Sequence, residues 1–282
     1  MNDFYLHTIL RGIAVPMVVG GAVYILARVT PTFIRDTLRG AGLAAAVLFS
    51  YILLLGMPDW PLTGSPKGVV SALLVASIWP LLEAMGTRRL WWKRFALIAA
   101  VNLVCLRPLV ESAWSLQSSL TILLGLTSTV VLIWFAIDRG SQQMQPSAVL
   151  AALAVISGTS AAFMWLTDHG GLAKLGGALA AALAIMTLLS LIRALRAQRE
   201  LNSVAVIALT AIWCTYAFYT DISWTKMIWL AGPFIWFVIR DILNWSGGTP
   251  VKDTITTILL TLPSGLWGLW LVYNKAIETQ IY

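Results

Sequence analysis

Apolar residues occur in ten long runs along the chain, and each run ends at a break of polar, glycine or proline residues. A membrane-spanning helix needs about 20 predominantly apolar residues. The runs near this length are 8–28, 38–57, 68–86, 95–114, 118–137, 147–167, 171–192, 202–220, 224–243 and 254–274. The pattern predicts an all-α fold, a polytopic bundle of about ten transmembrane helices joined by short loops.

Composition favours the same fold class. Of the 282 residues, 59% are hydrophobic and 11% charged, whereas an ordinary soluble domain is about 25% charged. Ten spans of about 20 residues leave about 80 for all loops and tails, so we expect one integral membrane domain over 1–282. The first run has no basic segment before it and no cleavage site after it, which predicts a retained helix and not a signal peptide.

Two parts of this map are open to a different interpretation. Segment 202–220 is diluted by Thr210, Thr215 and Tyr216, and without it the count would be nine. Pro31 favours the start of a helix, and Gly40 favours the end of one. Segment 31–39 is therefore expected to be a separate interfacial helix.

Lysine and arginine residues gather in three clusters, which follow the first, third and seventh predicted helices. The clusters are Arg28, Arg35 and Arg39; Arg88, Arg89, Lys93 and Arg94; and Arg193, Arg196 and Arg199. Basic residues are retained on the cytoplasmic face. We therefore expect a bacterial inner-membrane protein with both termini outside. The net charge of +7 does not imply a nucleic-acid partner, because the chain has no room for a basic domain.

The fourth run contains the strongest candidate for a functional site. Arg107 lies within the predicted span, where an arginine costs about 2.5–3.5 kcal/mol on insertion scales. Glu111 follows four residues later on the same helix face. One interpretation is a polar site, with Asn102, that lines a cavity open to the outside. The other is a structural ion pair that fixes this helix to a neighbour.

Charged residues near the ends of two other runs have simpler explanations. Glu83 is expected to pair with Arg88 or Arg89 at the membrane interface, because long side chains can reach it there. Arg240 and Asp241 are expected at headgroup depth.

Tryptophan is abundant, with fourteen residues. Those at predicted interfaces are explained as membrane anchors. The deeper ones are Trp79, Trp134, Trp213, Trp229, Trp236, Trp267 and Trp270. Trp79 and Trp236, in the proline-bearing third and ninth runs, are candidates for the wall of a substrate cavity, and Trp-rich faces could also contact other membrane subunits.

Small residues indicate where two helices pack closely. The sixth and seventh runs contain small residues over 157–162 and 176–184, and small residues let two membrane helices approach each other. These runs are expected to form a tight hairpin.

No pattern predicts a metal, a cofactor or a catalytic residue. The two histidines, His7 and His169, lie at predicted helix edges, and Cys105 and Cys214 lie in apolar runs without metal-binding spacing. The leading hypothesis is a secondary transporter or flippase for a small or lipid-linked molecule, with membrane lipids as partners. The alternatives are a non-catalytic subunit of a larger membrane complex and, third, a membrane-embedded transferase.

The predicted orientation can be tested by cysteine labelling. A cysteine placed in 88–94 should react with an impermeant thiol reagent only from the cytoplasmic side, and one near residue 278 only from the other side. Labelling of both positions from one side would contradict either the even number of spans or the orientation.

Overall fold

The structure is a computed structural model of the whole chain, and it describes residues 10–27, 29–58, 67–84, 90–167, 169–192, 199–219, 232–245 and 248–280. These residues form ten α-helices, a π-helical turn and a 3-10 turn. The expected all-helical class is confirmed for this part of the chain.

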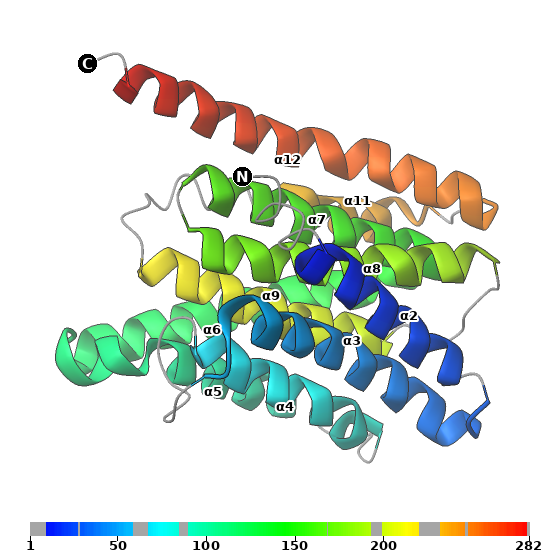
Figure 1. Cartoon of the computed structure of the whole chain (residues 1–282), viewed down its shortest axis with the longest axis horizontal. Helices are drawn as coiled ribbons and strands as arrows, with labels where there is room; N and C mark the ends of the chain where they lie inside the picture. The colour runs from blue at the N-terminus through cyan, green and yellow to red at the C-terminus, as the bar shows by residue number, and fades with distance from the viewer. Residues whose placement is uncertain are drawn as a thin grey trace.

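The helices pack side by side in one bundle (Figure 1). Their bounds are η1 Leu10–Ala14, α2 Val15–Leu26, α3 Thr32–Leu55, α4 Lys67–Ala84, α5 Leu90–Ser112, α6 Leu116–Ser141, α7 Pro146–Leu166, α8 Gly170–Ile192, α9 Arg199–Phe218, η2 Gly232–Phe234, α11 Ile235–Leu243 and α12 Pro250–Gln280.

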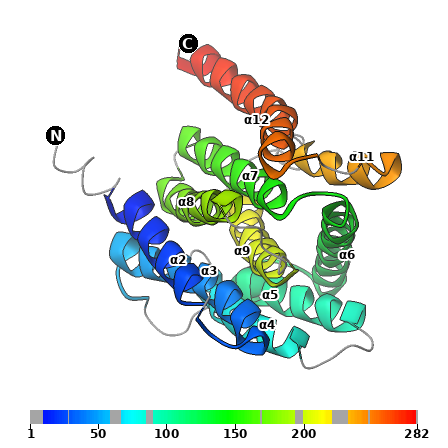
Figure 2. The same ribbon diagram turned by 90° about the vertical axis from the view of Figure 1, so that its right-hand side faces the viewer.

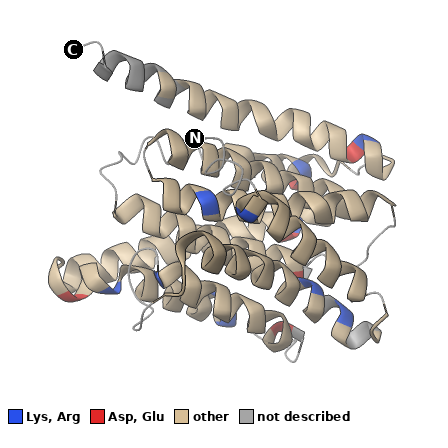
Figure 3. Cartoon of the chain, in the orientation of Figure 1, with Lys and Arg blue, Asp and Glu red and all other residues tan. Residues whose placement is uncertain are grey.

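Successive helices run in opposite directions, so the bundle has two distinct ends. We call the end where α4 stops and α5 starts the basic end, because Arg35, Arg39, Lys93 and Arg94 lie there with the stop of α6 and the start of α12. It is on the right in Figure 3, where charged residues mark the ends of α3, α4 and α12. Arg107 and Glu111 lie toward the opposite end.

In the part of the chain that the structure describes, six helices are long and apolar enough to cross a membrane. They contain the segments Thr37–Leu55, Trp91–Ser112, Leu116–Ser141, Pro146–Leu166, Gly170–Ile192 and Glu200–Phe218. The ten helices correspond in order to the ten predicted runs, and most differ from them by a few residues at the ends. Of the predicted run 224–243, residues 224–231 lie outside the described part of the chain, and α11 begins only at Ile235.

The expected helix stop at Gly40 is wrong, because α3 continues through it without a break. A methyl group at residue 40 would lie 2.6 Å from Cγ of Pro80 on α4. Gly40 therefore allows two helices to approach closely, and 31–39 is the first part of a longer helix and not a separate one.

Helix α9, formed by the predicted run that threonine and tyrosine residues dilute, lies at the centre of the bundle (Figure 2). In its span, 83% of the residues are buried, the largest share among the six. Thr210, Thr215 and Tyr216 are all buried, so they face other helices and not lipid. This position explains why α9 needs less apolar character than a peripheral helix.

Helices α7 and α8 form the expected tight hairpin. Gly176 of α8 packs against Ala161 of α7, where an added methyl group would lie 3.1 Å from Cβ of Ala161. Helix α12 crosses the outer side of α7, and its C-terminal part diverges from the bundle (Figures 1 and 2).

Two glycines of α6 provide a matched test of packing at the basic end. A methyl group at Gly140 would lie 2.8 Å from Cα of Phe237 on α11 and closer still to its carbonyl oxygen, whereas one at Gly125 would meet no atom within 4 Å. We expect Gly140→Ala to destabilise the protein by about 1–3 kcal/mol through overpacking. Gly125→Ala should be neutral or slightly stabilising.

The measurement is the thermal unfolding midpoint in detergent. Equal midpoints for the two variants would show that α6 and α11 do not make this contact.

Candidate functional site

The first buried polar cluster is centred on Arg94, in the first turns of α5. Its guanidinium donates to Oε1 of Glu83 on α4 at 2.6 Å and to Oδ2 of Asp138 on α6 at 2.5 Å. Ser203 on α9 donates to Oε2 of Glu83 at 2.7 Å. The Arg94 side chain is fully buried and that of Glu83 is 4% exposed. The Arg94 network (Glu83, Arg94, Asp138 and Ser203) therefore joins four helices.

Indole rings complete the surroundings of Arg94. Its Cζ atom lies 4.4 Å from the ring centroid of Trp134 and 4.8 Å from that of Trp91. Tryptophan is the best aromatic partner for a cation, and such a contact contributes roughly 2 kcal/mol when it is desolvated. Trp79 packs edge-on against Trp134, with centroids 6.4 Å apart. The charge is thus surrounded by carboxylates at its edge and by aromatic rings at its faces.

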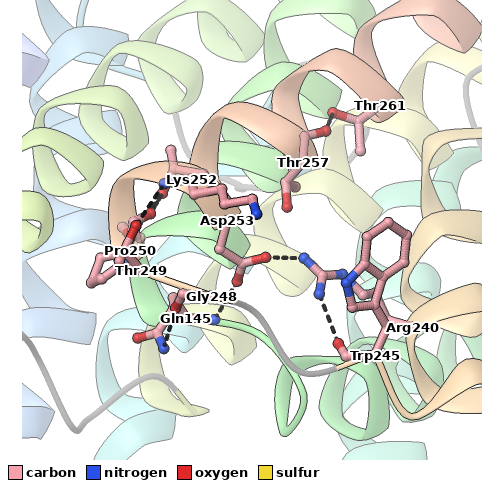
Figure 4. Close-up of polar contacts among 12 residues, drawn as sticks. Gln145, Arg240, Trp245, Gly248, Thr249, Pro250, Lys252, Asp253, Thr257 and Thr261 are labelled. Atoms are coloured by element: carbon pink, nitrogen blue, oxygen red, sulfur yellow. Dashed lines mark hydrogen bonds and ion pairs between the residues drawn. The ribbon is translucent and has the colours of Figure 1, made fainter.

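The second buried cluster is centred on Arg240, in the last turn of α11 (Figure 4). Arg240 forms an ion pair with Asp253 on α12, with both side chains 1% exposed, and donates to the carbonyl oxygen of Trp245 at 2.7 Å. The other carboxylate oxygen of Asp253 accepts the main-chain N–H of Gln145 at 2.7 Å, at the N-cap of α7. The Arg240 network (Gln145, Arg240, Trp245 and Asp253) therefore joins α7, α11 and α12.

Arg240 resembles Arg94 in its aromatic surroundings. Its Cζ atom lies 5.0 Å from the ring centroid of Trp236 and 5.2 Å from that of Trp245. The two rings pack edge to face, with centroids 5.7 Å apart. Both networks thus contain an arginine that is paired with at least one carboxylate of a neighbouring helix and placed against two indoles.

The last turn of α6 connects the two networks. Asp138 belongs to the Arg94 network, and the next residue, Arg139, pairs with Asp241 of α11 at 3.3 Å. Asp241 directly follows Arg240, and Gly140 lies against the main chain of α11. A displacement of this turn would therefore disturb both networks.

Three tryptophans lie one helical turn further into the bundle than the charged residues. Each precedes its charged residue by four positions: Trp79 and Glu83, Trp134 and Asp138, Trp236 and Arg240. Four residues place the indole on the same helix face, about 6 Å deeper. The three side chains are buried, and their Nε1 groups have no hydrogen-bond partner among the described residues. A buried N–H without a partner costs about 1–3 kcal/mol, so this layer of free donors needs an explanation.

The residues proposed from the sequence lie in separate places. Arg107 and Glu111 form the expected pair, with Nε and Oε1 2.6 Å apart, but their side chains are 52% and 59% exposed. Asn102 is buried and donates to Oγ1 of Thr127 on α6 at 3.2 Å. Arg107 is 13 residues beyond Arg94 along α5, a separation of about 20 Å.

The structure places the two candidate tryptophans with the arginine networks and not with Arg107. Trp79 lies beside the Arg94 network and Trp236 beside the Arg240 network. The five residues therefore divide between an exposed pair near one end, a buried amide in the middle and two indoles near the basic end.

The structure adds to two expectations for the charged residues. Among the described residues, Glu83 pairs with Arg94, and its expected partners Arg88 and Arg89 lie outside the described part of the chain. Arg240 is 1% exposed, so protein encloses its side chain, and the headgroup depth expected for Arg240 and Asp241 stays a prediction. Asp138 and Asp253 did not stand out in the sequence. The signal that would have found part of the site is the repeated spacing of a tryptophan four residues before a charged residue.

Comparison of the chain with known protein families, with characterised proteins and with solved structures finds no match.

Two arginines of α5 provide a matched test of the site. Arg94→Ala should destabilise the protein by about 3–5 kcal/mol, because it leaves buried carboxylates without their partner. Arg107→Ala removes an exposed pair between residues four apart, and such a pair contributes about 0.3–0.5 kcal/mol.

Thermal unfolding in detergent compares the two variants. We assign the packing of the bundle to Arg94 and not to Arg107. Similar losses of thermal stability in the two variants would contradict this assignment.

Proposed function

We propose that the chain is a multi-pass inner-membrane transporter or flippase for a small or lipid-linked molecule, and that its buried arginine networks hold one end closed. In this proposal the chain crosses the membrane about ten times. The basic end faces the cytoplasm, because basic residues are retained on that side, and both termini lie on the other side.

The observation that carries the proposal is the position of the described ion pairs that join different helices. They lie at the basic end and are Arg94–Glu83, Arg94–Asp138, Arg139–Asp241 and Arg240–Asp253. Toward the opposite end, the described pair Arg107–Glu111 lies within one helix, and α7 and α9 are joined there by an uncharged hydrogen bond between Thr167 and Tyr216. A protein that exposes a central site alternately to each face needs contacts that close one end while the other is free to open.

Buried charges support a functional interpretation of these contacts. Ionisable groups in membrane segments are costly, and they commonly mark transport pathways. Replacement of a buried ion pair by apolar residues is often neutral or stabilising, so stability alone does not require the five buried charged groups Glu83, Arg94, Asp138, Arg240 and Asp253. Ion pairs that can separate and re-form provide a reason for their presence.

A second candidate function is a non-catalytic subunit of a larger membrane complex. It is favoured by the outer face of α12, where Trp267, Trp270 and Tyr273 are 50%, 51% and 55% exposed. Trp267 and Trp270 contact each other, with centroids 5.0 Å apart. Such an aromatic face could contact another membrane subunit as well as lipid.

Thiol labelling at Asn102, in the middle of the bundle, separates the two functions. In a variant with Cys105→Ala and Cys214→Ala, Asn102→Cys should react with an impermeant maleimide from each side of the membrane, measured in vesicles of both orientations. Alternation between two open forms exposes a central residue to both faces.

Leu150→Cys is the control, because Leu150 is fully buried within α7 and should react from neither side. A cysteine at 102 that is as unreactive as the one at 150 would rule out alternating access and leave the subunit as the better explanation.

A further inference from the structure

The outward face of α5 changes from apolar to charged along its length. Positions three or four residues apart lie on one face of a helix. The exposed residues of α5 that follow this spacing are Trp92, Ala96, Ala100, Leu103, Arg107 and Glu111. The face is therefore apolar for about three turns, from residue 92 to residue 103, and it ends in an arginine and a glutamate.

The length of this face places the charged pair near the far boundary of a bilayer that α5 crosses. Tryptophan is enriched at membrane interfaces, so Trp92, which is 73% exposed, marks the boundary at the basic end. Arg107 and Glu111 lie 15 and 19 residues further along, or about 22 Å and 28 Å at the rise of an α-helix. The hydrocarbon core is about 30 Å thick. Arg107 thus begins below the far headgroups, and Glu111 lies about level with them.

The geometry of the pair leaves both charges available to a ligand. Nε of Arg107 donates to Oε1 of Glu111 at 2.6 Å, which directs the guanidinium one turn outward, toward the headgroups. The two Nη groups of Arg107 and Oε2 of Glu111 have no partner within the described part of the chain. The side chains are 52% and 59% exposed. Because a charge that faces hydrocarbon is costly, these groups need partners from outside the bundle.

We propose that Arg107 and Glu111 form a binding site for the headgroup of an ethanolamine phospholipid, in the leaflet opposite the basic end. The guanidinium binds the phosphate, to which an arginine can donate two parallel hydrogen bonds. The free carboxylate oxygen of Glu111 accepts a hydrogen bond from the ammonium group, which carries three N–H donors. The headgroup therefore presents the opposite charges in the same side-by-side arrangement.

This lipid stays at the surface of α5 and is not the transported molecule. The site goes beyond the proposed function, and it requires only that α5 spans the bilayer. It would serve a transporter and a subunit of a complex equally.

Other common headgroups satisfy only part of this site. A choline headgroup has a cation without N–H groups, so it cannot donate to Glu111. A glycerol headgroup can donate a hydroxyl group, but it brings no positive charge to offset the repulsion between its phosphate and the carboxylate. The site should therefore prefer ethanolamine to both.

Native mass spectrometry measures this preference as the first lipid bound per protein, when lipids with identical acyl chains are titrated into the detergent-solubilised protein. The wild type should bind the ethanolamine lipid about tenfold more tightly than the choline lipid, because one charge-assisted hydrogen bond is gained. Arg107→Gln should lose most of the ethanolamine lipid. Glu111→Gln should lose the preference for ethanolamine over choline and bind more of the glycerol lipid, since the repelling carboxylate is absent.

Gln117→Ala is the matched control, because Gln117 is an exposed, uncharged residue in the first turn of α6 at the same end of the bundle. It should bind lipids as the wild type does. Equal binding of the ethanolamine and choline lipids by the wild type, or an unchanged preference in Glu111→Gln, would overturn the ammonium contact. Unchanged ethanolamine binding in Arg107→Gln, or an equal loss in the control, would overturn the site. None of these measurements depends on transport, so a failure of alternating access at Asn102 would leave the lipid site standing.

Discussion

Arg94 shows why the helices of the bundle meet as they do at the basic end. A guanidinium removed from water needs acceptors of opposite charge, since the effective cost of burying an unpaired ion is several kcal/mol. Helix α5 cannot supply these acceptors on the face it buries, so Glu83 comes from α4 and Asp138 from α6. The positions of three helix ends are thereby fixed relative to one charge. Ser203 extends the constraint to the central helix α9.

The tryptophans determine how deep these charges can lie. Trp79, Trp134 and Trp236 occupy the turn below the charged residues, and the faces of Trp134 and Trp236 contact the guanidinium groups. An indole is apolar over most of its surface and polar at one atom, which suits the boundary between charged groups and a hydrocarbon-like interior. The free Nε1 groups point to a polar partner that the packing of the described residues does not supply.

Hydrophobic periodicity was sufficient to predict the helical class and the order of the helices, because ten apolar runs separated by breaks leave few alternatives. It was not sufficient for Gly40, where the same residue type can end a helix or allow close packing, and only the position of Pro80 on another helix decides between them. The candidate site was harder to predict. Arg94 and Glu83 are eleven residues apart on successive helices, so their pairing depends on where α5 begins. Arg107 was predicted as a site residue because it lies in an apolar run. The exposure of its side chain depends on the rotation of α5 about its own axis within the bundle, and a single sequence does not reveal this rotation.

The location of the networks at one end determines how easily they can separate. An ion pair in the hydrocarbon core has no water to replace its partner, and separating it there would cost most of the Coulomb attraction at low dielectric. Near the cytoplasmic headgroups, where we propose that the basic end lies, water can solvate each group as the pair opens. The same contacts that fix three helix ends in the closed form are then weak enough to exchange for hydration in an open form. Because Asp138 and Arg139 are neighbours on α6 but bind different helices, opening at this turn would release α5 and α11 together.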